Sequence, residues 1–363
     1  MDFITGAFLL FFTICVAVYY SIPKKGQWIW LLLCSIFFYL CASVKLSIFI
    51  LFSIISSFVA ARRLEQLCAR EQAVREKTDP DQKKETDVNV HKKAVAALLI
   101  GSNAGLLFLL KFASSGSFFV ARLHLGRLAF LLPMGISFYT LQIIAYVVDV
   151  YRGKYPAEKN FLQYMLFVMY FPQILQGPIG RYSRLAEQLY AEHSFKWENI
   201  ARGFERILWG FFKKMILADW AAVFADTIFD DPSKYNGVAL WGVLFYTIQL
   251  YADFSGGMDV VIGIAQMFGI QLDENFKRPF FAVSITDFWH RWHITLGTWM
   301  KDYVFYPVTL SGWMGKFGKW GKKTFGKKIG RTLPICLANL IVFFVVGVWH
   351  GAAWKYIVYG MYN

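Results

Sequence analysis

The chain has 363 residues, of which 57% are hydrophobic, 19% aromatic and 17% charged. A soluble domain of this length carries nearer a quarter charged residues, so the composition excludes an ordinary soluble fold. The net charge of +14 would suit nucleic acid, but lysines and arginines gather in two polar stretches beside apolar blocks, as in membrane proteins, so we expect no nucleic-acid partner.

Apolar blocks that are long enough to cross a bilayer as helices follow one another along the chain. The pattern predicts an all-α, polytopic, multi-pass integral membrane protein, with residues 1–363 in a single membrane domain. The chain stops inside another apolar run, "YIVYGMYN", so we expect a fragment or a very short last helix. The predicted spans are 3–22, 27–44, 46–61, 94–110, 129–148, 161–180, 237–252 and 332–354.

Two basic stretches orient the predicted spans. Residues 62–93 hold nine Lys and Arg residues, and residues 301–331 hold eight. Basic loops beside spans mark the cytoplasmic side and favour anionic lipid headgroups, so we assign 62–93 to the cytoplasm. We expect 279–331 to combine a re-entrant or interfacial stretch with a basic loop. Its lysines would also suit docking of an acidic cytosolic partner.

Two aspartates interrupt an apolar run in "YADFSGGMDVVIG". Ionisable residues at membrane depth indicate a pathway, a pair or chemistry. On one helix Asp253 and Asp259 lie about 240° apart, so they share a face only if 255–257 breaks the helix, and the paired glycines there make a break plausible. Each aspartate could instead form its own structural pair, or both could line the permeation route of a transporter or channel.

The stretch "ITDFWHRWHITLGTWMKDYVFYP" concentrates polar and aromatic side chains. His290 and His293 are three residues apart, which predicts one side of a helix with Trp292 beside them. With Asp287 they resemble metal ligands, but no third histidine is nearby, so we expect no metal site. An interfacial belt and the wall of an active site both remain open interpretations.

A single histidine, His350, lies in the uncharged run "FFVVGVWHGAAWKYIVYG". Such a residue is often a satisfied core side chain, but Gly347 and Gly351 flank the imidazole and would let backbone or substrate come close. Asn339 lies eleven residues earlier, about 20° away in azimuth, and could line the same cavity. A neutral imidazole here suits a general base acting on a hydroxyl that attacks an acyl carbonyl. No G-x-S-x-G elbow is present, which favours direct transfer.

Several of these segments resemble the membrane-bound O-acyltransferase (MBOAT) family, in the bacterial branch of alginate O-acetyltransferases and teichoic-acid D-alanyl transfer proteins. The resemblance is carried by "PMGISFYTLQIIAYVVDVYRG", "FPQILQGPIGRY", "LYADFSGGMDVVIG", "DFWHRWHITLGTWMKDYVFYP" and "VWHGAAWKYIVYG". It implies a multi-pass protein of a bacterial cell membrane, with a helical bundle and re-entrant segments around a transmembrane tunnel, and further C-terminal spans that this chain lacks. It implies His350 and His293 as catalytic residues, and as supporting or tunnel residues Asn339, Trp292, Trp349, Asp253 and Asp259.

The resemblance also implies a reaction. An acyl group, on balance acetyl, would move from a cytoplasmic thioester towards hydroxyls of an extracytoplasmic cell-surface polysaccharide. The donor, acetyl-CoA or an acyl carrier thioester, would be a co-substrate, and no cofactor would stay bound. The expected partners are that donor or its carrier protein, a secreted or membrane-tethered acyltransferase partner, and membrane lipids. The alternatives are D-alanyl transfer to teichoic acid, a transporter or channel, and an inactive scaffold.

Overall fold

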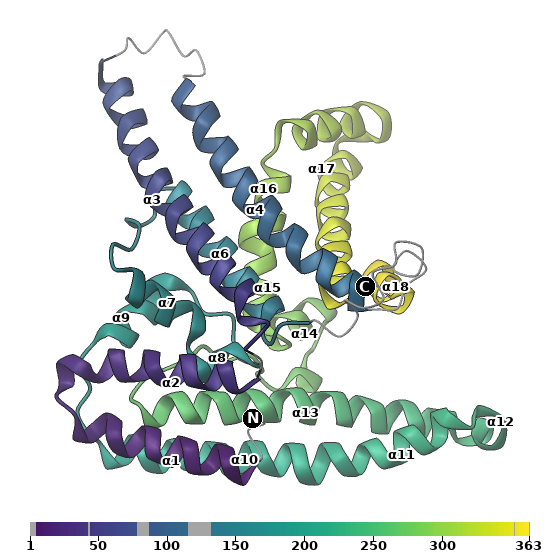
Figure 1. Ribbon diagram of the computed structural model, residues 1–363. Coiled ribbons are helices and arrows are strands. Elements are labelled where there is room, and N and C mark those ends of the chain that lie inside the picture. The colour runs from purple at the N-terminus through teal and green to yellow at the C-terminus, as the bar shows by residue number, and fades with distance from the viewer. Residues whose placement is uncertain (1–4, 43, 78–86, 115–131, 352, 363) are drawn as a thin grey trace. The chain divides into compact units, whose positions relative to one another are not determined.

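The computed structural model describes residues 5–42, 44–77, 87–114, 132–351 and 353–362 (Figure 1). Helices make up all the regular secondary structure of these residues, and none of them lies in a strand. The predicted all-α fold is therefore confirmed. The chain divides into two compact units, each built from two stretches: unit 1 is Met1–Val44 with Leu162–Thr295, and unit 2 is Lys45–Phe161 with Leu296–Asn363.

Unit 1 is organised around one long helix, α13, along which α10 and α11 pack (Figure 1). The helices of this unit are α1 (Gly6–Ser21), α2 (Gln27–Ala42), α7 (Phe161–Met169), α8 (Phe171–Ile174), α9 (Tyr182–Tyr190), α10 (Trp197–Phe211), α11 (Asp219–Asp230), α12 (Pro232–Tyr235), α13 (Ala239–Met267) and α14 (Ile285–Arg291), with 3₁₀ turns at Lys24–Gly26, Asn236–Val238 and Pro279–Phe281, and the π-helical segment η3 at Phe212–Ala218.

Paired glycines set the close packing of α10 on α13. A Cβ on Gly210 would lie 2.6 Å from the carbonyl oxygen of Gly256, and a Cβ on Gly203 would lie 2.7 Å from that of Gly263. Both pairs bring backbone against backbone, as small residues do where helices approach closely in membranes. The glycines are seven residues apart on each helix, so they recur on one face every two turns.

Unit 2 holds the longest helix, α17. Gly326 leaves the helical conformation with a φ of 84°, which divides α17 into two segments. Beyond it, Gly330 packs so closely on Lys322 and Gly321 that the two segments form a hairpin. The helices of this unit are α3 (Ser47–Lys77), α4 (Asp87–Ser114), α6 (Ile136–Tyr151), α15 (Ile294–Met300, which begins in unit 1), α16 (Tyr306–Thr309), α17 (Gly312–His350) and α18 (Trp354–Tyr362), with the π-helical segment η6 at Lys301–Phe305.

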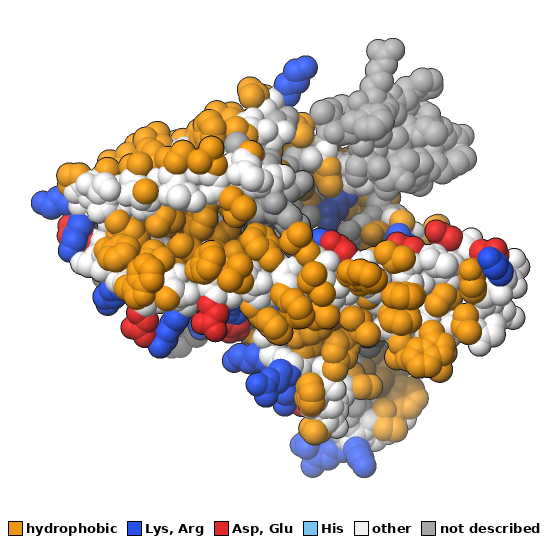
Figure 2. Space-filling model, turned by 90° about the horizontal axis from the view of Figure 1, so that it is seen from below, with side chains coloured by type: hydrophobic (Ala, Val, Ile, Leu, Met, Phe, Trp, Pro, Cys, Tyr) orange, Lys and Arg blue, Asp and Glu red, His pale blue; other side chains and the backbone are white. Residues whose placement is uncertain are grey.

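Four helices of the described chain are long and apolar enough to cross a membrane: Lys24–Ala42, Ser47–Ala73, Val88–Phe112 and Gly312–His350. Two shorter apolar helices, Gly6–Ser21 and Ile136–Tyr151, overlap the predicted spans 3–22 and 129–148. Residues 129–131 of one predicted span lie outside the described residues. Figure 2 shows a face with a broad area of hydrophobic side chains. Exposed apolar side chains of α10, η3 and α11 include Phe204, Leu208, Trp209, Met215, Trp220 and Val223.

The predicted span 161–180 is wrong. This segment forms α7 of nine residues and α8 of four residues, followed by an irregular stretch. Tyr170 takes a ψ of 110° before Pro172, which occupies the first turn of α8. Proline cannot donate its own hydrogen bond within a helix and clashes with the preceding turn, so it starts a new helix here and does not continue α7.

The two basic stretches are more helical than expected. The predicted basic loop within 279–331 forms the first segment of α17 and the start of its second segment, and only Gly326 interrupts its helical backbone. Residues 62–77 continue α3 and residues 87–93 belong to α4, whereas 78–86 lie outside the described residues. The cytoplasmic location of 62–93 and the single membrane domain stay predictions.

Candidate functional site

His293 lies between two short helices of the conspicuous polar stretch. Helix α14 ends at Arg291, Trp292 is extended, and His293 has a φ of 44°, in the left-handed region that non-glycine residues seldom adopt. The prediction that His290 and His293 share one side of a helix is therefore wrong. Such strained residues persist where their surroundings hold them, and they are common at functional sites.

Asn275 holds His293 in this conformation. The Asn275 Oδ1 atom accepts hydrogen bonds from the backbone N–H and the hydroxyl of Thr295, at 3.0 and 2.9 Å. It lies 3.1 Å from His293 Nδ1. A backbone N–H only donates, so this Asn275 atom is the acceptor oxygen, and Nδ1 of His293 must carry the proton. The neutral imidazole then has its lone pair on Nε2, the form that can accept a proton.

Aromatic rings surround His293 and its neighbour. The His293 side chain is 5% exposed and meets the Phe254 ring edge-on, with 4.8 Å between ring centroids. Trp292 stacks on Phe288 and meets Phe276 edge-on, at 5.6 and 5.1 Å. Trp292 is thus a packing residue of an aromatic cluster in unit 1.

Asp287 forms a local pair at the start of α14. Its carboxylate accepts hydrogen bonds from Arg291 Nε at 2.8 Å and from the backbone N–H of Val283 at 3.1 Å. The Arg291 bond, followed by the Val283 bond, lowers the pKa of this carboxyl. Asp287 is therefore a structural anion. In the described part of the chain, no group of three or more His, Cys, Asp or Glu side chains could hold a metal.

Asp253 and Asp259 of α13 form separate ion pairs with cations of α10 and η3. Asp253 pairs with Lys214 at 2.9 Å, and its side chain is 50% exposed. Asp259 pairs with Lys213 and, at 3.0 Å, with Arg206. Helix α13 runs unbroken through 255–257, so of the two open interpretations the structure has separate ion pairs and not a break. Gly256 serves the approach of α10, whereas Gly257 makes room for the Gln176 side chain.

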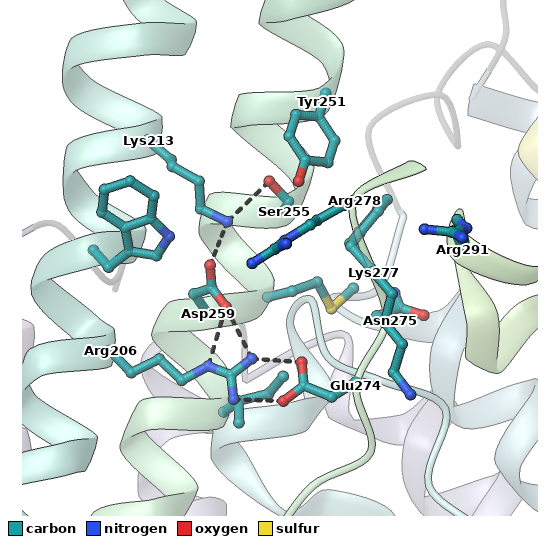
Figure 3. Close-up of a pocket in the computed structure, with 14 residues that line it drawn as sticks. Arg206, Lys213, Tyr251, Ser255, Asp259, Glu274, Asn275, Lys277, Arg278 and Arg291 are labelled. Atoms are coloured by element: carbon teal, nitrogen blue, oxygen red, sulfur yellow. Dashed lines mark hydrogen bonds and ion pairs between the residues drawn. The ribbon is translucent and has the colours of Figure 1, made fainter. Parts of the chain in front are cut away.

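Asp259 and its two partners line a cavity of about 410 Å³ within unit 1 (Figure 3). Lys213 donates to Ser255 Oγ at 3.0 Å, and Arg206 makes two hydrogen bonds of 2.6 Å to Glu274. Asn275 also lines the cavity, which links it to His293. Lys213 lies in η3, and π-helical segments are frequent at functional sites.

His350 is the last residue of α17, in unit 2, and its side chain is exposed. Its ring lies 4.8 Å from the Trp349 ring and 6.3 and 6.2 Å from those of Tyr356 and Tyr359 of α18. Trp349 is buried and donates from Nε1 to the carbonyl of Ser137 at 3.2 Å, which ties the end of α17 to α6.

Lys111 of α4 binds the same helix end. Its ammonium donates to the Trp349 carbonyl, approaches the His350 carbonyl at 3.5 Å, and lies 5.1 Å above the Trp349 ring. A cation at a helix C-terminus is favourable, because the last carbonyls lack partners within the helix. Three elements of unit 2 thus fix the backbone beneath the His350 imidazole.

Gly347 lets backbone come close, as predicted, whereas Gly351 makes room for a side chain. A Cβ on Gly347 would lie 2.5 Å from the Tyr356 carbonyl oxygen, and one on Gly351 would meet the Tyr356 ring at 2.6 Å. The occupant at these glycines is α18. Asn339 lies on the same continuous segment of α17 as His350, and its side chain is exposed.

Lys111, Asn275 and the Arg206–Glu274 pair were not predicted from the sequence. Lys111 carried a usable signal, since it is a lone charge at the end of an apolar run. Asn275 had none, because it lies eighteen residues before its partner in an irregular segment.

The long apolar helices, the apolar surface and the two histidine-bearing sites define a helical membrane protein with candidate groups for proton transfer. The model of the membrane-bound O-acyltransferase family matches residues 158–363. The chain belongs to this family, which confirms the resemblance and the prediction of an all-α polytopic membrane protein.

Named relatives come from several bacteria. A probable alginate O-acetylase of Pseudomonas syringae pv. tomato is 40% identical over 64% of this chain and 42% of its own length. A peptidoglycan O-acetyltransferase of Helicobacter pylori is 31% identical over 92% of this chain and 62% of its own length. A teichoic acid D-alanyltransferase of Bacillus subtilis is 30% identical over 63% of this chain and 56% of its own length. The chain therefore spans less than two thirds of these relatives.

Proposed function

We propose that this chain is an O-acyltransferase of the bacterial cell membrane, which moves an acetyl group from a cytoplasmic thioester towards hydroxyls of a polysaccharide outside the cell. One observation carries the proposal: the stretch matched by the family model contains both His293 and His350. The 40% identity to an alginate O-acetylase, against 30% to a D-alanyltransferase, supports acetyl as the transferred group.

His350 is the proposed general base. Its neutral imidazole accepts the hydroxyl proton while the hydroxyl oxygen attacks the thioester carbonyl carbon. The new C–O bond forms, the C–S bond breaks, and the leaving thiolate takes up the proton from the imidazolium. Such a base contributes about 10²–10⁴-fold to a rate. The contacts of Trp349 with Ser137 and with Lys111 support this role, because they position the backbone that carries the ring.

His293 is the proposed second proton-transfer group. Its Nδ1 proton is engaged by Asn275, so proton exchange would proceed at Nε2. Acetyl-CoA or an acyl carrier thioester is the proposed donor, and a secreted or membrane-tethered partner would complete transfer to the polymer. Asn339, Trp292, Trp349, Asp253 and Asp259 are proposed as supporting residues.

D-alanyl transfer from a carrier protein is the second candidate. The first segment of α17 and the turn after it, residues 312–331, contain seven Lys and Arg residues and no acidic residue. Such a surface would suit an acidic carrier protein through charge complementarity. The group found on the cell-surface polymer distinguishes the two candidates.

The test compares His350→Ala with His290→Ala, an exposed histidine of α14 to which no role is given. We expect the first variant to lose at least about a hundredfold in transfer rate, and the second to keep the wild-type rate. Acyl groups on the cell surface are measured by mass spectrometry, with expression and membrane insertion checked for each variant. Unchanged acylation in His350→Ala would refute the proposed mechanism. Flux through liposomes without a donor, reduced by Asp253→Asn, would favour a transporter instead.

A further inference from the structure

The cavity of unit 1 contains more positive than negative charge. Its lining has five cationic side chains and two carboxylates: Arg206, Lys213, Lys277, Arg278 and Arg291, and Asp259 and Glu274. Lys213 is buried and Arg206 is half-buried, where an unpaired cation would be costly, whereas Lys277 and Arg278 are exposed.

Three of these cations are already paired. Arg206 bridges Glu274 and Asp259, Lys213 pairs with Asp259, and Arg291 bonds to Asp287 outside the lining. Neither Lys277 nor Arg278 forms an ion pair with any carboxylate in the described ranges of the chain. The lining therefore has two cations without a protein counter-ion, enough for a ligand group with a charge of about −2.

The backbone holds these two cations at the cavity. Arg278 has a φ of 47°, in the left-handed region, and the N–H of Lys277 donates to the Arg291 carbonyl at 2.9 Å. Figure 3 shows the Arg278 side chain directed towards the ion pairs of Lys213 and Arg206. Strain of this kind indicates that the surrounding structure, and not the local preference of arginine, sets the position of the side chain.

A neutral donor completes the lining. Asn275 is 1% exposed, and its Nδ2 atom has no hydrogen-bond partner among the residues that the structure describes. A buried amide N–H without an acceptor is unfavourable, and an oxygen-rich anion in the cavity would supply one. The unpaired cations and the unsatisfied amide are independent observations, and both point to an anionic ligand.

We propose that this cavity binds a phosphate group of a larger ligand. Phosphate offers the two charges that match Lys277 and Arg278, and its oxygens suit the fork of an arginine guanidinium. The cavity volume of about 410 Å³ exceeds that of a phosphate, so the rest of the ligand would lie against Trp209, Tyr251 and Phe276. The phosphate ester comes either from a soluble acyl donor, an assignment that rests on the proposed function, or from an anionic lipid headgroup.

The test measures binding of coenzyme A to the purified full chain in nanodiscs of phosphatidylcholine. We expect Arg278→Gln and Lys277→Gln each to weaken binding roughly tenfold or more, as expected when a hydrogen bond to a charged group is lost. Lys196→Gln, an exposed lysine before α10, is the matched control and should bind as wild type. Arg278→Lys, which keeps the charge, should recover part of the affinity, and thermal unfolding verifies that each variant is folded.

A second arm identifies the source of the phosphate. Coenzyme A binding in nanodiscs that contain phosphatidic acid shows whether this lipid competes for the site. Mass spectrometry of the purified protein shows whether such a lipid co-purifies. Dependence of either ligand on Arg278 and Lys277 supports the phosphate site and names its occupant. Equal affinities in wild type, both glutamine variants and the Lys196 control for both ligands would overturn it. Phosphate binding without acyl transfer would refute the proposed function alone, whereas transfer without this binding would refute the inference alone.

Discussion

At the scale of single residues, Asn275 connects two features of unit 1. Its oxygen accepts hydrogen bonds from the Thr295 backbone and hydroxyl and from the His293 ring, and the residue also lines the cavity. A substitution at Asn275 should therefore affect folding stability and the state of His293 together.

We predict that Asn275→Leu costs about 2–5 kcal/mol of unfolding free energy, because the Thr295 N–H and the His293 Nδ1–H both lose a buried acceptor. Asn275→Asp keeps an acceptor oxygen at the same place and should cost less. Thermal and denaturant unfolding in detergent measure the difference. The ¹⁵N shifts of the histidine ring report whether the Nδ1-protonated form is lost in the leucine variant. Equal stabilities of wild type and Asn275→Leu would contradict the proposed anchoring.

The residues located from sequence are those that stand out against an apolar background. His350, Asp253 and Asp259 are polar groups inside oily runs, so composition alone marks them. Their partners could not be located in this way. Lys213 and Asp259 meet through the packing of α10 and η3 on α13, and the left-handed backbone of His293 follows from a hydrogen bond to a distant segment.

At the scale of helices, composition located most of the predicted elements but not their interruptions. Residues 161–180 contain no charge, yet Pro172 splits the segment. Conversely, paired glycines in α13 suggested a break, although they serve close packing. A glycine that breaks a helix and a glycine that packs against another helix look alike until the partner helix is known.

This distinction gives a prediction for Gly210. Gly210→Ala places a methyl group against the Gly256 carbonyl and the Val260 backbone nitrogen, at 2.6 and 2.8 Å, so α10 must move away from α13. We expect a loss of about 1–3 kcal/mol in unfolding free energy, as for other overpacked sites.

Gly101→Ala is the matched control for Gly210→Ala. Gly101 lies inside α4, with nothing within 4 Å of the place that an added methyl group would take. We expect this change to be neutral or to stabilise by about 0.5–1 kcal/mol, because alanine favours a helix more than glycine does. Chemical unfolding of both variants gives the comparison, and equal effects would show that close contact at Gly210 is not what matters.

At the scale of the whole molecule, family membership and membrane character were accessible from the sequence because the motifs are long and occur in order. The division into two units was not, since each unit is assembled from two stretches that are far apart in the chain. The distribution of charge still predicts the topology of the whole chain, because basic residues beside spans mark the connections that lie on the cytoplasmic side.

The positive charges predict a specific topology. Lys25, Arg63 and Lys323 should face the cytoplasm, whereas Lys45, between α2 and α3, should face outwards, because α2 and the first part of α3 each cross the membrane once. Each of these exposed residues can be changed to cysteine in a variant whose five native cysteines are replaced. A membrane-impermeant thiol reagent applied to intact spheroplasts should then label only the Lys45→Cys variant, and inverted vesicles should show the opposite pattern. Labelling of Lys323→Cys from outside would place the basic hairpin on the wrong side for a cytoplasmic donor, and the proposed direction of transfer would be wrong with it.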